Sequence, residues 1–200
     1  MIGTMFVRCN ETYVDGCMRG FSGLELQAGE LYPCTAHSVV NDDARLLIGG
    51  FYRPKWLEAR YLDDAYPGRP WPLSAQWGVL SDHFGDRWSR LLMAPRQLLP
   101  LADQLQDGLG IDEEIIIDVE EAFRRETARD ELILNLYRAA DGKVGWSRFA
   151  TWAQETLEET SPKAIPVFSD EQVVVLAEIS AMTDAPDDVE AFVGCAVTRI

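Results

Sequence analysis

Residues 30–50, with the sequence ELYPCTAHSVVNDDARLLIGG, contain two mainly apolar runs on either side of a short polar turn. The first run is Glu30–Val40, the turn is Asn41-Asp42-Asp43, and the second run is Ala44–Gly50. Two such runs around a polar turn predict a β-hairpin. Pro33 lies within the first run, and it predicts an edge position or a bulge because proline cannot donate to a sheet ladder.

Further short strands are predicted on both sides of this hairpin. Thr4–Cys9 is a weakly alternating, β-prone segment. Lys55–Leu62 closes the region, with Trp56, Leu57 and Tyr61 as expected contacts in or around a core. Several short strands separated by turns predict a small barrel or sandwich.

The order of these segments resembles the small SH3-like barrel domains that are common in bacteriophage and mobile-element proteins. The resemblance covers residues 4–62. The positions that carry it are Arg8-Cys9, Leu26, Gly29, Tyr32, Asp42-Asp43, Trp56 and Arg60-Tyr61. It implies an N-terminal SH3-like β-barrel and a protein of phage or mobile-element type.

The remainder of the chain predicts a linker and then helices. Residues 63–78 hold three prolines and two tryptophans, which predicts a linker that packs on another surface. Residues 79–200 show mainly helical periodicity. The sequence therefore predicts an α+β fold, with a barrel over residues 1–62, a linker over residues 63–78 and an acidic helical domain over residues 79–200.

Seven helical segments are expected in the C-terminal part. The first, Leu80–Pro95, has Phe84, Trp88, Leu91 and Leu92 on one stripe, with Ser81 as its N-cap. The segment Ser169–Met182 opens on a capping box formed by Ser169 and Gln172. The other five segments are Ala94–Gly110, Ile111–Ala128, Arg129–Gly142, Gly145–Glu159 and Pro186–Val197.

The net charge of −15 is unevenly distributed along the chain. Residues 1–101 contain 10 Lys and Arg against 11 Asp and Glu, whereas residues 102–200 contain 8 against 22. Such a field repels nucleic acid and anionic membrane surfaces, so neither is an expected partner. It favours a protein partner with a basic surface, or it serves only to keep the protein soluble.

The cysteines and histidines do not form a common metal pattern. Cys9, Cys17, Cys34 and Cys195 include no CxxC pair, and the chain has two histidines. We expect the cysteines to pack as small hydrophobic residues, with Cys195 in the core of the last helix. No metal and no cofactor are expected.

No catalytic motif is present, and no catalytic residue is assigned. The phosphate-binding loop and the Gly-x-Ser-x-Gly elbow are both missing from the sequence. The start of the chain shows no signal-peptide pattern, and no window of 18 apolar residues occurs, so a cytoplasmic location is expected.

The strongest functional feature of the sequence is the acidic run from Asp112 to Glu131. The residues expected to bind a partner are Glu113, Glu114, Asp118, Glu120, Glu121, Glu126, Asp130 and Glu131. Together with the resemblance, this run predicts a non-enzymatic inhibitor of a host defence complex, of anti-CRISPR or antirestriction type. An immunity or adaptor protein that neutralises a toxin is an alternative. A metal-dependent enzyme using Asp82, His83 and Asp86 is a third alternative.

Overall fold

A computed structural model describes residues 6–10, 29–48, 55–66, 69, 77–84, 88–106, 116–159 and 167–200. For residues 55, 84, 88, 104–106 and 116–118 it describes the backbone alone.

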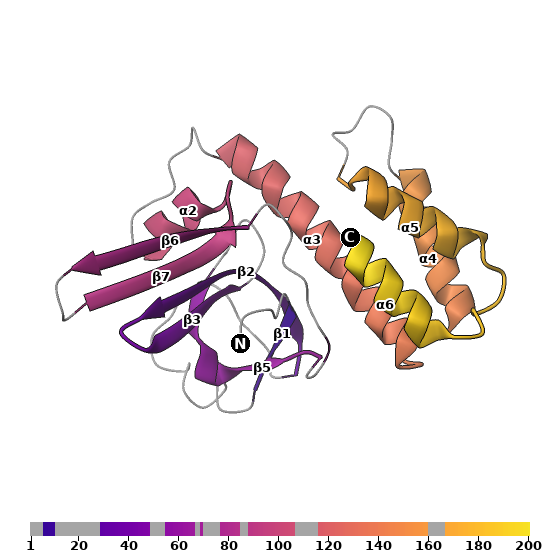
Figure 1. Cartoon of the computed structure of the whole chain (residues 1–200), viewed down its shortest axis with the longest axis horizontal. Helices are drawn as coiled ribbons and strands as arrows, with labels where there is room; N and C mark the ends of the chain where they lie inside the picture. Colours follow the sequence, from indigo (N-terminus) through magenta and orange to yellow (C-terminus); the bar gives the residue numbers. More distant parts are fainter. Residues whose placement is uncertain are drawn as a thin grey trace. The chain divides into compact units, whose positions relative to one another are not determined.

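An antiparallel sheet is followed along the chain by helices (Figure 1). The strands are β1 (Phe6–Cys9), β2 (Leu31–Val40), β3 (Asp43–Ile48), β4 (Lys55–Glu58), β5 (Leu62–Asp64), β6 (Trp77–Phe84) and β7 (Trp88–Pro95). The helices are the 3-10 turn η1 (Ala59–Tyr61), α2 (Leu99–Gln106), α3 (Ile116–Ala140), α4 (Trp146–Glu159), α5 (Asp170–Ala181) and α6 (Val189–Arg199). The predicted α+β class is confirmed.

Strand β2 is the centre of the sheet. It pairs with β1 through Leu31–Pro33, with β3 through Cys34–Val40 and with β7 through His37–Val40. The strand order is β4-β3-β2-β1-β5, and β6 joins the sheet by pairing with β7. The strands predicted around Thr4–Cys9, Glu30–Val40 and Ala44–Gly50 are confirmed within the described residues.

The β2–β3 hairpin turns through Asn41 and Asp42, whose φ angles are 47° and 72°. Two successive residues with positive φ are typical of a type I′ turn, and Asn and Asp tolerate this conformation. The pairing of β2 with β3 also shifts register between Cys34 and Ala36, directly after Pro33. The predicted hairpin turn and the predicted bulge are both confirmed.

The helix predicted over Leu80–Pro95 is wrong, because these residues form strands β6 and β7. Leu80 pairs with Leu92 across this second hairpin, and β7 pairs in turn with β2. Leu92 and Ala94, two positions apart, are both fully buried, whereas Leu91 and Met93 are only half-buried. That period of two is typical of a strand with one covered face. The apolar residues also fitted a helical stripe, and pairing with β2 decides between the two patterns.

The chain divides into two compact units, Met1–Glu126 and Thr127–Ile200. In the first unit, one core cluster joins a face of the sheet to helices α2 and α3. Its buried residues are Ala36, Leu47, Leu92, Ala94, Leu98, Leu101, Ala102, Val119, Ala122 and Phe123. A second cluster lies among β1, β2, β3 and β4, and its buried residues are Val7, Cys9, Cys34, Ile48 and Leu57.

In the second unit, helices α4 and α5 pack side by side (Figure 1). The indole ring of Trp146 lies edge-on to the rings of Phe149 and Phe192, with 5.6 Å between ring centroids in each case. Trp146, Phe149 and Ala153 are the buried residues of α4. None of the described helices combines the length and the apolar composition needed to cross a membrane.

The capping box predicted at the start of α5 is confirmed. The Ser169 hydroxyl accepts a hydrogen bond from the Gln172 backbone N–H at 3.3 Å, and the Gln172 side-chain oxygen accepts one from the Ser169 N–H at 2.9 Å. Helix α3 ends before Gly142, whose φ of 68° gives the left-handed conformation common after a helix.

Two of the cysteines pack as predicted, and one does not. Cys9 and Cys34 are buried in the second core cluster. Cys195 is exposed, so its assignment to the core is wrong. Val193, Ala196 and Val197 form the buried face of α6, and Cys195 lies outside that face because it follows Val193 by only two positions. Cys17 lies outside the described residues.

Candidate functional site

The acidic run is only partly described. Glu113 and Glu114 lie outside the described residues, and Asp118 lies in α3 with its backbone alone described. The remaining predicted partner-binding residues are Glu120, Glu121, Glu126, Asp130 and Glu131, and all belong to α3. Their surroundings differ strongly along the helix.

Glu120 and Glu121 pair with arginines one turn later in the same helix. A carboxylate oxygen of Glu120 lies 2.7 Å from a guanidinium nitrogen of Arg124, and Glu121 forms an ion pair with Arg125. Pairs with this spacing typically stabilise a helix by about 0.3–0.5 kcal/mol. They also reduce the negative charge that this part of α3 presents to a partner.

Glu126 and Asp130 are buried, with 5% and 1% of their surface exposed. The nearest guanidinium nitrogen of Arg129 lies 3.5 Å from the Asp130 carboxylate, and Arg129 Nε donates a 2.8 Å hydrogen bond to the main-chain oxygen of Ile200. These carboxylates are therefore not presented to solvent, and a partner protein could not reach them. Glu131 is the exposed member of these five.

A different group of carboxylates is gathered where α4 ends and α5 begins. Glu155, Glu158 and Glu159 are exposed at the end of α4, and Asp170 and Glu171 are exposed in the first turn of α5. Helices α4 and α5 contact each other, and Figure 1 shows the end of α4 and the start of α5 at the same end of this pair. We call these five residues the acidic end.

Helix stability explains only two of the five residues of the acidic end. Asp170 and Glu171 lie at the start of α5, where the helix dipole favours negative charge. Glu158 and Glu159 lie in the last turn of α4, where the dipole disfavours it, and that turn contains no basic residue. Glu155 and Glu159 are also like charges at i and i+4, which typically costs about 0.2–0.5 kcal/mol.

The sequence contained a signal for the acidic end. The segment ETLEE, residues 155–159, closes a predicted helix without Lys or Arg, and the capping box at Ser169 places two more carboxylates at the start of the next helix. The run in α3 contains more carboxylates, and the prediction was therefore based on that run. Lys163 lies between the two helices, outside the described residues.

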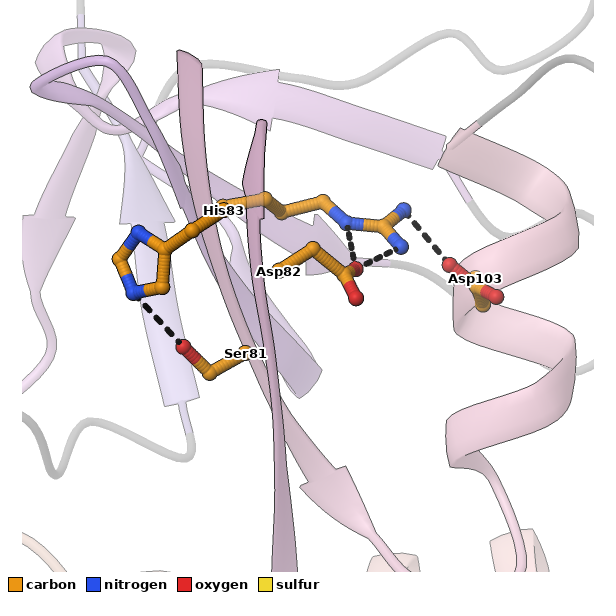
Figure 2. Close-up of polar contacts among 5 residues, drawn as sticks. Ser81, Asp82, His83 and Asp103 are labelled. Atoms are coloured by element: carbon orange, nitrogen blue, oxygen red, sulfur yellow. Dashed lines mark hydrogen bonds and ion pairs between the residues drawn. The ribbon is translucent and has the colours of Figure 1, made fainter. Parts of the chain in front are cut away.

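The three residues considered for a metal-dependent enzyme are not brought together as a metal site. Arg90 Nε donates a 3.0 Å hydrogen bond to Asp82 Oδ2, and Arg90 Nη1 lies 2.6 Å from Asp103 Oδ1 (Figure 2). The His83 imidazole lies apart from these groups, with Nε2 3.4 Å from the Ser81 hydroxyl oxygen. Asp86 lies outside the described residues.

Asp82 and His83 are consecutive residues of strand β6, so their side chains lie on opposite faces of the sheet. Asp82 is engaged by Arg90. Burial disfavours the charge of Arg90, but its hydrogen bond to Asp82 and the negative charges of Asp103 and Asp82 outweigh that effect and raise its pKa. Within the described part of the chain, no three His, Cys, Asp or Glu side chains gather as metal ligands would.

Comparisons of this chain with protein-family models, with curated proteins and with solved structures give no match.

Proposed function

We propose that this chain is a non-enzymatic binding protein that recognises a basic surface of a partner protein through its acidic end. The observation that carries the proposal is the placement of Glu158 and Glu159 in the last turn of α4, where they oppose the helix dipole. Charges that lower the stability of their own helix are expected where they serve binding.

The exposure of the acidic end supports this role. All five of its carboxylates are exposed, and among the described residues no Lys or Arg is in an ion pair with any of them. Glu158 accepts a 2.9 Å hydrogen bond from Gln154, which leaves its negative charge uncompensated. The net charge of −15 adds a long-range field that steers basic partners towards the protein and falls off with salt.

The proposal extends to the class of partner. We propose that residues 4–62 form an SH3-like barrel of the phage and mobile-element type, and that the protein inhibits a host defence complex by covering a basic surface of it. Support for the barrel is the pairing of β1 with both β2 and β5, which brings the first and last of the five N-terminal strands together. The class of partner rests on the sequence resemblance and on the acidic charge.

The proposed function is tested by capture of partners from bacterial lysate on the immobilised protein, with elution by a salt gradient. We expect at least one basic, nucleic-acid-handling protein that elutes at moderate salt. The double variant Glu158→Lys, Glu159→Lys should no longer capture this protein, because the charge of the acidic end changes by four units.

A matched control reverses two exposed carboxylates elsewhere in the same unit, Asp184→Lys and Asp187→Lys. This control has the same overall charge as the α4 variant, but its acidic end is intact. It should therefore still capture the partner. Capture that is insensitive to salt, or equal loss in both variants, would show that the acidic end does not recognise a partner. Capture of a toxin encoded beside this protein would favour the immunity alternative.

A further inference from the structure

The first unit contains a cavity of about 240 Å³ that the proposed function does not use. Strands β2, β3 and β7 line one side, and β1, β5 and the 3-10 turn η1 line the other. This volume leaves room for a small organic molecule.

The register of the sheet determines which side chains face this cavity. His37 pairs with Leu46 on one neighbouring strand and with Met93 on the other, and directly paired residues point to the same face. Val39 pairs with Leu91 and, two positions from His37, shares that face. All five residues line the cavity, so the side chains that this face of the sheet presents to it are apolar apart from one imidazole.

The imidazole of His37 is held in place by its neighbours. The bulge after Cys34 puts Cys34 and His37 on the same face, where the Cys34 sulfur lies 3.6 Å from His37 Nε2. The indole of Trp77 lies beside the imidazole, with 5.8 Å between ring centroids. Burial lowers the pKa of His37 to about 4, so this wall carries no positive charge at neutral pH.

The opposite wall supplies a carboxylate. Val7 pairs with Asp64 and both line the cavity, so the Asp64 side chain points to the same face as buried Val7. Asp64 Oδ1 accepts a 2.8 Å hydrogen bond from the Tyr66 backbone N–H, which fixes the carboxylate and leaves its second oxygen for another donor. No basic side chain of the described residues is paired with Asp64.

The other charged residues at the cavity point away from its interior. Asp63 pairs in register with Arg8, on the face opposite to Val7 and Asp64. Arg45 pairs with Ser38, so its side chain lies on the face of the sheet opposite to His37. Asp64 is itself exposed, so its carboxylate is the charge at the mouth of the cavity.

The geometry points to a binding site for a small organic cation in this cavity, namely a primary ammonium group on a compact apolar body. The apolar side chains of β2, β3 and β7 would cover the body, and the free oxygen of Asp64 would accept a hydrogen bond from the ammonium. Sites of this kind combine a mainly apolar wall with a few fixed polar groups. The inference concerns the first unit and does not rest on the proposed function of the acidic end.

Three probes of nearly the same shape test the charge preference: benzylamine, benzyl alcohol and benzoate. Binding to the full chain is followed through the backbone amide resonances of β2 and β5 at pH 7. We expect benzylamine to bind best, with benzyl alcohol about fivefold weaker and benzoate weakest. Equal binding of all three, preference for benzoate, or no binding of benzylamine would overturn the proposal.

Two variants locate the site. Asp64→Asn keeps the oxygen that accepts the hydrogen bond from the Tyr66 N–H. This variant should bind benzylamine about fivefold more weakly, and its affinity for benzyl alcohol should be unchanged. Ala44→Leu should weaken both probes, because Ala44 lines the cavity and the larger side chain fills it. The control Asp43→Asn alters an exposed carboxylate of β3 outside the lining and should change neither. Unchanged benzylamine binding in both Asp64→Asn and Ala44→Leu would place the probe elsewhere and overturn the proposal.

Discussion

The guanidinium of Arg90 on strand β7 lies 2.6 Å from the carboxylate of Asp103 on helix α2, measured from Nη1 to Oδ1. The same guanidinium binds Asp82 on β6, and the Arg90 side chain is only 10% exposed. The Arg90 side chain therefore links strands β7 and β6 to helix α2 (Figure 2). Asp82, which was considered as a metal ligand on the basis of the sequence, is therefore hydrogen-bonded to Arg90.

Replacement of Arg90 tests the strength of this link. Arg90→Met should lower the free energy of unfolding by roughly 2 kcal/mol, because it leaves two partly buried carboxylates without their partner. Arg124→Met is the control, since its pair with Glu120 is exposed on α3 and should contribute less than about 0.5 kcal/mol. Urea unfolding measures both. Equal effects of the two changes would contradict this account of Arg90.

His37 makes stability depend on pH in a defined window. Its pKa is lowered from the ordinary value of 6.5 to about 4 by burial. Between these values the unfolded chain binds a proton that the folded chain does not, so stability falls as the pH falls and the loss is complete below about pH 4. From pH 7 to pH 5 the loss at this site is about 2 kcal/mol.

The variant His37→Gln isolates this effect. The difference in unfolding free energy between pH 7 and pH 5 should be smaller in the variant than in the unsubstituted protein by about 2 kcal/mol. His83→Gln provides the control, because the His83 ring is on the exposed face of β6. An identical pH dependence in the His37 variant would show that the imidazole is not buried in the neutral form.

Two glycines should respond to alanine in opposite directions. Gly142 has a φ of 68°, where a β-carbon is strained, so Gly142→Ala should destabilise by about 1 kcal/mol. Gly194 lies inside α6, and an added β-carbon there meets no atom within 4 Å. Gly194→Ala should therefore stabilise by about 0.5–1 kcal/mol, since alanine favours the helix. Shifts of the same sign in thermal unfolding would be inconsistent with this geometry.

The cysteines should differ in their reaction with a thiol reagent under native conditions. Cys195 is exposed on α6 and should be labelled within the native protein, whereas Cys9 and Cys34 are buried and should react only on unfolding. Peptide mapping by mass spectrometry after a short exposure identifies the labelled positions. Labelling of Cys34 before Cys195 would contradict the packing of the second core cluster.

The local signals in the sequence predicted much of the fold. The β2–β3 hairpin follows from Asn41 and Asp42, which tolerate positive φ, and the start of α5 follows from Ser169 and Gln172. These features were predictable because each depends on residues a few positions apart. The β6–β7 hairpin was not, because Leu91 and Leu92 fit a helical stripe as well as a strand, and pairing with β2 decides the outcome.

The candidate site was harder to predict for a similar reason. Spacing along α3 shows which carboxylates share a face but not which face is covered, so it could not show that Glu126 and Asp130 are buried. The acidic end depends on the packing of α4 against α5, which sets where the last turn of α4 lies relative to the first turn of α5. The dipole of α4, rather than the net charge, distinguishes this group.

The most direct test of the central claim is the affinity of the captured partner for the triple variant Glu155→Gln, Glu158→Gln, Glu159→Gln. Removing these charges should raise the stability of α4 by about 0.3–1 kcal/mol, so a loss of binding cannot be attributed to unfolding. The account predicts that the variant melts at a higher temperature and binds the partner at least about tenfold more weakly at physiological salt. Unchanged affinity in this more stable variant would contradict the claim that the acidic end binds the partner.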